Sequence, residues 1–172
     1  MELGLDLPRE GELAAGRAIM AALIGEGIST IDTIMGVHER NPLHVLVYRE
    51  DQKVTGVLAF LLLRPAGLLS IVTDRFDGVA PDLDLIAGPD ETPLAGYGWG
   101  LAAKTRKAAA AVLVGMDKIR NEIYPVIPFF ARVATPDGRR VACGRLRYVP
   151  FPRSSNGLLW NPPIVPETES AQ

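Results

Sequence analysis

A short basic turn, residues 104–107 with the sequence KTRK, holds the side chains best suited to chemistry. It follows an apolar run with alternating aromatic residues, Tyr97 and Trp99, and it precedes a run of alanines, which has high helix propensity. The pattern predicts a strand, a turn and an uncapped helix start. The first amides of a helix have no intrahelical acceptor and carry the positive end of its dipole. We therefore expect the amides of residues 107–109, aided by Arg106, to bind phosphate; the alternative is a solvated helix start.

Three further side chains have reactive groups but lack partners in the sequence. Cys143 is the single cysteine, and because no histidine lies near it we expect a buried, inert thiol. His38 and His44 have no cysteine or carboxylate at ligand spacing, so the sequence predicts no metal site.

The elements that must position the basic turn begin with two helices and a hairpin. Apolar spacing close to 3.6 residues predicts a helix over residues 9–25. Ser29 is the expected N-cap of a second helix that ends near Glu39, before Asn41-Pro42. Residues 44–48 and 54–63 then read as an antiparallel hairpin whose second strand is apolar on both faces and therefore central.

The second half of the chain alternates strands and helices. Residues 67–72 suit either a strand or a helical turn, and residues 74–93 are rich in Asp, Gly and Pro. Most of residues 64–91 are therefore expected to form a long, partly ordered excursion. A set of alternating elements follows, with strands over 95–103, 129–133, 148–151 and 157–160 and helices over 105–124 and 137–146. Thr135 is the expected cap of the last helix, with Pro136 at its first position. This order predicts an α/β fold with a mixed, mostly antiparallel central sheet flanked by helices.

Length and charge limit the class of protein. The 172 residues predict one domain, residues 1–165, followed by a disordered tail, residues 166–172. No apolar stretch is long enough to cross a membrane, no signal peptide is recognisable, and one cysteine cannot form an internal disulfide, so we expect a cytoplasmic protein. Residues 1–100 have a net charge of −8 and residues 101–153 a net charge of +8. The basic half suits a polyanionic small ligand or a salt-bridged contact with the acidic half, whereas its apolar aromatic runs do not suggest a nucleic-acid surface.

The order of elements, with a basic turn opening a helix after the central strand, resembles the GNAT acyltransferase superfamily. The family's pyrophosphate loop has Arg or Gln, two variable residues, Gly, one variable residue, then Gly or Ala. Residues 106–111 have this spacing, with Ala109 and Ala111 at the usual glycine positions. Residues 134–151 resemble the family's last helix and its Leu-Gly-Phe ending, with Leu146-Arg147-Tyr148 as the triplet.

The resemblance implies an acyl-coenzyme A ligand, acetyl-CoA or another acyl-CoA. By this likeness the acyl-CoA would lie along the strand, with the pyrophosphate of its CoA part at the start of the helix. The implied binding residues are Leu101, Ala102, Ala103, Arg106, Lys107, Ala108, Ala109 and Ala111. Two positions depart from the family pattern: Arg147 replaces the glycine of the triplet, and Cys143 stands where many members have a tyrosine general acid.

The catalytic candidates are the remaining hydroxyls, Tyr148 and Tyr97. A tyrosine has a pKa near 10 and is suited to protonating a departing thiolate. Tyr97 and Trp99 share a strand face, where they form part of the core or wall a substrate pocket. The acids of the long excursion either orient an amine or belong to a solvated loop; they are Asp74, Asp77, Asp82, Asp84, Asp90 and Glu91.

Two functions therefore remain open at the level of sequence. The first is an acyl-CoA-dependent N-acyltransferase that acts on a small-molecule or peptide amine. The second is an inactive protein of the same fold that binds CoA or a protein partner. Fold alone does not decide between these two functions. Either function is compatible with a homodimer.

Overall fold

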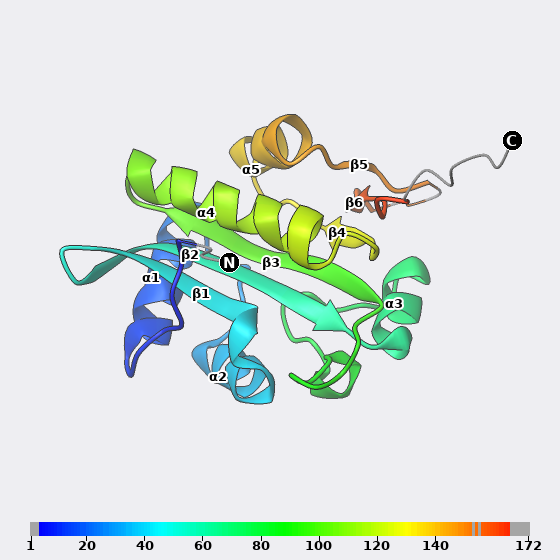
Figure 1. Ribbon diagram of the computed structural model, residues 1–172, viewed down its shortest axis with the longest axis horizontal. Helices are drawn as coiled ribbons and strands as arrows, with labels where there is room; N and C mark the ends of the chain where they lie inside the picture. Colours follow the sequence, from blue (N-terminus) through cyan, green and yellow to red (C-terminus); the bar gives the residue numbers. More distant parts are fainter. Residues whose placement is uncertain (1–3, 153, 155, 166–172) are drawn as a thin grey trace, which may run out of the picture.

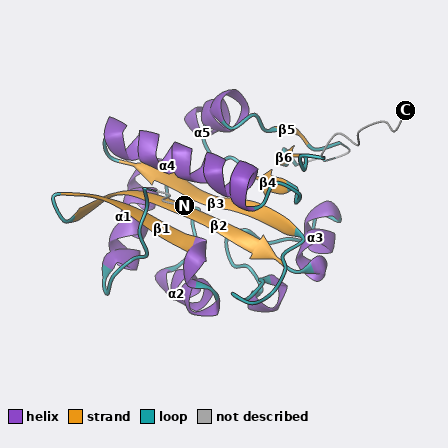
Figure 2. Ribbon diagram, in the orientation of Figure 1, coloured by secondary structure: helices purple, strands orange, loops and turns teal. Residues whose placement is uncertain are grey.

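The computed structural model describes residues 4–152, 154 and 156–165, so the predicted tail at 166–172 lies outside the described residues. Its centre is a six-stranded sheet in the order β1-β2-β3-β4-β6-β5, in which only β3 and β4 run parallel. Helices flank the sheet (Figures 1 and 2). The predicted α/β class with a mixed, mostly antiparallel sheet is confirmed.

Two helices precede the sheet. They are α1 (Glu12–Ile24) and α2 (Ile31–Arg40). The N-cap of α2 is Thr30, whose hydroxyl accepts from the amide of Thr33, so the prediction of Ser29 as the cap was wrong by one residue. Ser29 is buried, and its carbonyl accepts from Arg17 instead.

The hairpin forms as predicted, with β1 (Val45–Glu50) antiparallel to β2 (Lys53–Leu63). Asp51 and Gln52 make the turn, both with positive φ, which matches the right-handed twist of the two strands. β2 lies between β1 and β3, and its last eight residues are buried. The prediction of a central second strand is therefore confirmed.

The excursion over residues 64–91 begins with a helix, so the helical alternative for residues 67–72 is confirmed, and the residues after it have no regular strand or helix beyond one 3-10 turn. Pro65 opens a helix, α3 (Pro65–Val72), and a 3-10 turn follows at Leu83–Leu85. Ile86 is fully buried and forms a bridge with Leu63 at the end of β2. Because the segment is rich in Asp, Gly and Pro, the sequence did not indicate the apolar side chains that hold it against the sheet.

The central strand β3 (Ala95–Ala103) has the bounds that the sequence predicts. The next helix, α4 (Arg106–Lys118), is shorter than predicted, because a π-helical turn, Ile119–Ile123, replaces its last residues. β4 (Phe129–Ala131) is also shorter than predicted and ends two residues early.

The last elements are short. α5 (Pro136–Arg140) begins at the predicted cap, Thr135, whose hydroxyl accepts from the amide of Gly138, and it continues as a π-helical turn, Val141–Arg145. Two short strands end the described chain, β5 (Val149–Pro150) and β6 (Leu159–Asn161). The predicted strands at 148–151 and 157–160 exist with different bounds.

Side-chain alternation along β2 divides the core into two layers. Leu58, Phe60 and Leu62 pack on one face with side chains of α4. Val57 and Ala59 face the other way, toward α1 and α2. In Figure 1, α4 accordingly lies on one side of the sheet, with α1 on the opposite side. Among the described residues, none of the helices has the length and apolar character needed to span a membrane.

Candidate functional site

The central feature of the site is a gap between the parallel strands β3 and β4. The two strands pair only from Gly96 to Gly98 on β3, opposite residues 129–131. β3 continues to Ala103 along its other edge, where it stays paired with β2. Because β4 ends early, the second half of β3 has one edge without a strand partner.

This free edge presents backbone amides to the gap. The amide of Lys104 donates to the carbonyl of Thr55 on β2 at 2.8 Å. Backbone groups alternate between the two edges of a strand, so the amides of Leu101 and Ala103 point away from β2 and into the gap. The predicted binding residue Ala102 has the opposite orientation, with its amide toward β2 and its side chain buried.

A β-bulge bends β3 at the gap. Ala59 and Phe60 are consecutive on β2, but they face Gly100 and Gly98 on β3, so Trp99 is the extra residue. A bulge increases local twist and re-aims side chains, and such bulges are common beside functional sites. Glycine at position 100 allows α1 to approach, because a Cβ there would collide with the sulfur of Met20.

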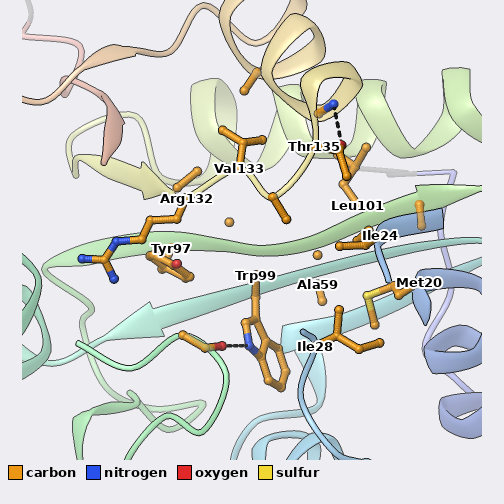
Figure 3. Close-up of a pocket in the computed structure, with 18 of the residues that line it drawn as sticks. Met20, Ile24, Ile28, Ala59, Tyr97, Trp99, Leu101, Arg132, Val133 and Thr135 are labelled. Carbon is orange, nitrogen blue, oxygen red and sulfur yellow. Dashed lines mark hydrogen bonds between the residues drawn. The ribbon is translucent and has the colours of Figure 1, made fainter. Parts of the chain in front are cut away.

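A cavity of about 1010 Å³ passes through the sheet at this gap. Its walls include residues from both layers of the core (Figure 3). On the side of α4 and α5 the lining is formed by Leu101, Leu113, Met116, Val133, Ala142 and Leu146; on the side of α1 it is formed by Met20, Ile24, Ile28, Phe76, Tyr97 and Trp99. The volume is at the upper end of the range for single-ligand pockets, which is about 300–1,000 Å³.

Tyr148 lines the cavity on the α4 side. The residue is 3% exposed, and its hydroxyl is buried without a hydrogen-bond partner among the described residues. A Cβ built at Gly98 would lie 4.0 Å from this hydroxyl, so the group lies beside β3 where the strands part. Burial raises the pKa of Tyr148, and the Arg120 guanidinium opposes that rise.

The backbone around Tyr148 is held from several directions. Its amide donates to the carbonyl of Ala142 at 2.9 Å, and Asn161 donates to the carbonyls of Leu146 and Arg147, each at 3.1 Å. The buried guanidinium of Arg120 also donates to Leu146 and lies over the Tyr148 ring, 5.8 Å from its centroid. The Tyr148 side chain is therefore fixed in orientation while its hydroxyl stays unpaired.

Arg147 has a left-handed backbone, with a φ of 59°. Glycine adopts this conformation without a steric penalty, whereas other residues pay a cost because their Cβ crowds the backbone. The position at which the sequence departs from the glycine of the resembled triplet is thus one where the backbone favours glycine.

Tyr97 lines the same cavity from the other layer. Its ring packs on Phe76 with centroids 4.9 Å apart, and it is 5% exposed. Burial raises the pKa of Tyr97. Tyr97 and Trp99 pack in the core and also line the cavity. The two candidate hydroxyls lie on opposite faces of β3.

The start of α4 is capped, which contradicts the expected uncapped helix. The Thr105 hydroxyl accepts from the amide of Ala108 at 3.0 Å, and the Thr105 carbonyl accepts from the amide of Ala109 at 2.9 Å. Of the three amides expected to bind phosphate, only that of Lys107 lacks an acceptor among the described residues. The amide of Arg106 is the second one available, so the candidate anion site shifts by one residue.

An acidic side chain already lies beside this helix start. The Glu50 carboxylate accepts from Thr105 at 2.6 Å and from Thr55 at 2.7 Å. These two hydrogen bonds, together with the charge of Lys107, lower the pKa of Glu50. Glu50 thus provides part of the negative charge that the three basic residues of the turn require.

The alanines of the predicted loop have different environments. Ala108 is fully buried against the β1–β2 hairpin, where a Cβ on Gly56 would lie 3.2 Å from its side chain. Ala109 lines the cavity, as do the predicted strand residues Leu101, Ala102 and Ala103, whereas Ala111 does not line it. Arg106 and Lys107 are exposed at the start of α4.

Cys143 and His44 lie away from the cavity lining. The expectation of a buried thiol was wrong, because Cys143 is exposed on the π-helical turn that follows α5. His44 is fully buried and accepts at Nε2 from the amide of Leu62, and burial lowers its pKa to about 4. Within the described part of the chain, no group of three His, Cys, Asp or Glu side chains is arranged to hold a metal ion.

Two of the six acids from residues 64–91 reach the cavity. Asp74 and Asp77 line it, whereas Glu91 pairs with Arg64 outside it. Asp74 forms a 2.6 Å ion pair with Arg132, which follows β4. Sequence reasoning missed Arg132 because the predicted strand extended over it.

The cavity thus brings together an open strand edge, a buried tyrosine and the two acids of the loop before β3. No protein-family model matches this chain, and no curated protein is similar to it.

Arg120 and the α1 side chains were also missed by sequence reasoning. In the sequence they are a lone arginine in a helix and an ordinary apolar helix face, and neither pattern indicates a functional site until the fold is known.

Proposed function

We propose that this protein is an acyl-CoA-dependent N-acyltransferase of the GNAT type that acts on an amine. The single observation that carries the proposal is the cavity that crosses the sheet at the gap between β3 and β4. A transferase must bring two substrates together, and a cavity with walls in both core layers allows them to approach from opposite faces. The volume lies at the upper end of the range for single-ligand pockets.

The arrangement of elements supports a GNAT-like fold as the finer description. The central strand leads through a basic turn into α4, as the resemblance requires. The triplet Leu146-Arg147-Tyr148 has its middle residue in the left-handed conformation, which explains why glycine would be usual there. This support comes from geometry at the positions that carry the likeness.

The described residues fit an acyl-CoA ligand. The amides of Arg106 and Lys107, with their basic side chains, would hold the pyrophosphate, and the open edge of β3 would hold the arm that leads to the thioester. Ala109 faces the cavity with only a methyl group. When bound, acyl-CoA would supply an activated acyl group as a thioester.

The chain itself can contribute two effects. The amides of Leu101 and Ala103 can donate to a carbonyl oxygen, and a preorganised donor of this kind contributes about 3 kcal/mol to a transition state. The Tyr148 hydroxyl can give its proton to a leaving sulfur, since it has no hydrogen-bond partner among the described residues. A tyrosine with an ordinary pKa near 10 is already protonated at neutral pH, as an acid requires. Burial raises the pKa of Tyr148 further, which makes its proton harder to give up.

The second candidate is an inactive protein of the same fold that binds CoA or a protein partner. Glu50 favours it, because its carboxylate lies at the helix start where a phosphate would have to bind. The two candidates differ in catalysis and share the CoA site, so one set of measurements separates them.

The experiment is a calorimetric titration with acetyl-CoA, followed by a thiol-release assay with amines. We use the Cys143→Ser variant throughout, because the exposed thiol would react with the reagent that detects free CoA. Binding with amine-dependent release of CoA supports the transferase. Binding without release for any amine favours the inactive binding protein, and no binding at millimolar ligand contradicts a CoA site in either candidate.

A further inference from the structure

The part of the cavity on the α1 side forms a distinct chamber. We define the acceptor chamber by Met20, Ile24, Ile28, Trp99 and the loop 74–79, all of which line the cavity. We propose that this chamber binds a primary amine carried on an apolar skeleton, such as an arylalkylamine or an amino acid with an apolar side chain. The proposal rests on the proposed function and names the class of acceptor.

The position of the chamber follows from the direction of approach. The start of α4 and the Tyr148 hydroxyl both lie on the α4 side of β3. A thioester bound there fills the gap from that side, so a nucleophile must come from the opposite face. The acceptor chamber is the part of the cavity on that face (Figure 3).

Most of the chamber wall is apolar. Met20 lies on the backbone of Gly100, and Ile24 and Ile28 extend the same wall from α1 and the loop after it. The rim is apolar too, since Leu23 is 53% exposed and Val79 is 48% exposed where they line the cavity. A polyamine or a sugar would place charged groups or hydroxyls against this surface without partners, and a lysine stem covers less of it than an aromatic or branched skeleton does.

The Trp99 indole is held as a rigid part of this wall. Its Nε1 donates to the carbonyl of Gly78 at 2.7 Å, which ties β3 to the loop 74–79. With its polar group satisfied, the ring offers an apolar face to a ligand, and aromatic faces also attract cations.

Polar groups occupy the other end of the chamber. Asp74 is engaged by Arg132 and Asn156, but Asp77 forms no ion pair among the described residues. One Asp77 oxygen accepts from the amides of Val79 and Ala80, at 2.8 and 3.1 Å, which leaves the second oxygen for an ammonium group.

Arg75 is the one further charged residue of this loop that lines the chamber. Its Nε donates to Thr73 at 3.1 Å, and the guanidinium has donors left for a carboxylate. An amino acid would engage both Asp77 and Arg75, whereas a simple arylalkylamine would engage Asp77 alone. The shared chemistry is the amine next to an apolar group.

The test is a panel of amines in the thiol-release assay with acetyl-CoA. The panel contains phenethylamine, phenylalanine, spermidine, glucosamine and lysine. We expect kcat/KM at least tenfold higher for phenethylamine or phenylalanine than for the three polar amines, and the better of the two identifies the source of the amine. Higher kcat/KM for a polar amine would overturn the inference while leaving the transferase intact.

Variants of the chamber provide a second readout, which does not depend on turnover. In saturation-transfer NMR, phenethylamine should bind wild type, bind Ile24→Asp and Asp77→Asn at least fivefold more weakly, and bind the control Leu69→Asp normally. Leu69 is equally apolar and 55% exposed, but it lies on α3 away from the lining. Equal binding by all variants, or none by wild type, would overturn the chamber, whatever the result with acetyl-CoA.

Discussion

At the scale of single residues, Tyr148 has the least usual environment in the site. A buried hydroxyl is normally paired, because leaving it unsatisfied costs about 1–3 kcal/mol. Here the ring is fixed by packing under Arg120 and the residue lines the cavity, while its hydroxyl has no hydrogen-bond partner among the described residues. Such an arrangement keeps a proton donor available to a ligand at the expense of stability.

Tyr148→Phe should therefore separate stability from activity. Removing the unpaired hydroxyl should raise the free energy of unfolding by about 1 kcal/mol, and losing a general acid should lower kcat by about 10²–10⁴-fold. Denaturant unfolding and the thiol-release assay measure the two effects. The matched control is Tyr97→Phe, on the opposite face of β3, which should lower kcat much less; an unchanged kcat in Tyr148→Phe would remove this residue from the catalytic role.

Arg147 offers a second test at the residue scale. Its left-handed backbone should destabilise the folded state by about 1–2 kcal/mol, and a glycine would remove part of this cost. Glycine also makes the unfolded chain more flexible, which opposes folding by about 0.5–1 kcal/mol. Arg147→Gly should consequently stabilise the protein by about 0.5–1 kcal/mol in chemical denaturation. Arg145→Gly, in the preceding π-helical turn, should destabilise it by a similar amount, and a loss of stability in Arg147→Gly would show that the backbone there is not strained.

At the scale of elements, the short strand β4 creates the site. Had β4 reached Val133, as the sequence suggested, it would have continued along β3 and closed the gap. It ends at Ala131, and the next residues, Arg132 and Val133, become cavity wall instead. Strand ends depend on tertiary pairing more than on local composition, so the sequence predicted that β4 exists and not where it stops.

Prediction succeeded where local signals were strong. The bounds of β3 followed from its apolar run and the charged turn after it, and Thr135 with Pro136 marked the start of α5. The sequence left residues 67–72 open between a strand and a helical turn, because the eight residues of α3 are too few to show helical periodicity beside a loop rich in Asp and Gly. Thr105 is an ordinary N-cap residue, but the cap of α4 was not predicted because the basic side chains on both sides of it indicated an anion site instead.

His44 links two elements and should make stability depend on pH. It ends the 3-10 turn Pro42–His44 and accepts from the amide of Leu62 in the middle of the sheet, so it must be neutral in the folded state. Burial lowers its pKa from 6.5 to about 4. Between these values the unfolded chain binds more protons than the folded one, so stability is complete above pH 6.5 and falls as the pH drops toward 4.

The loss over this window should be about 3 kcal/mol, from about 1.4 kcal/mol for each unit of pKa. Urea unfolding at several pH values measures it. His44→Gln keeps an acceptor for Leu62 without a titrating group, so its stability should be flatter between pH 6.5 and 4.5. The same slope in His44→Gln as in wild type would contradict the assignment.

At the scale of the whole molecule, the two halves of the chain contribute different sides of the cavity. The acidic half supplies α1, α2 and the loop with Asp77, whereas the basic half supplies α4, α5 and β4. This division places positive charge where a polyphosphate would bind and a carboxylate where an amine would enter. The charge asymmetry of the sequence thus corresponds to two differently charged sides of one cavity, which composition alone could not show.

The central claim is that the cavity and the start of α4 form an acyl-CoA site. Thermal unfolding with and without acetyl-CoA tests it most directly, in wild type, in Arg106→Glu and in Arg145→Glu, which changes the charge equally at an exposed residue outside the cavity lining. At a hundred times its Kd, the ligand should stabilise wild type and Arg145→Glu by about 2.7 kcal/mol, which raises Tm by several degrees. Arg106→Glu should lose most of that shift. No shift in wild type at millimolar acetyl-CoA, or equal shifts in all three proteins, would contradict the site.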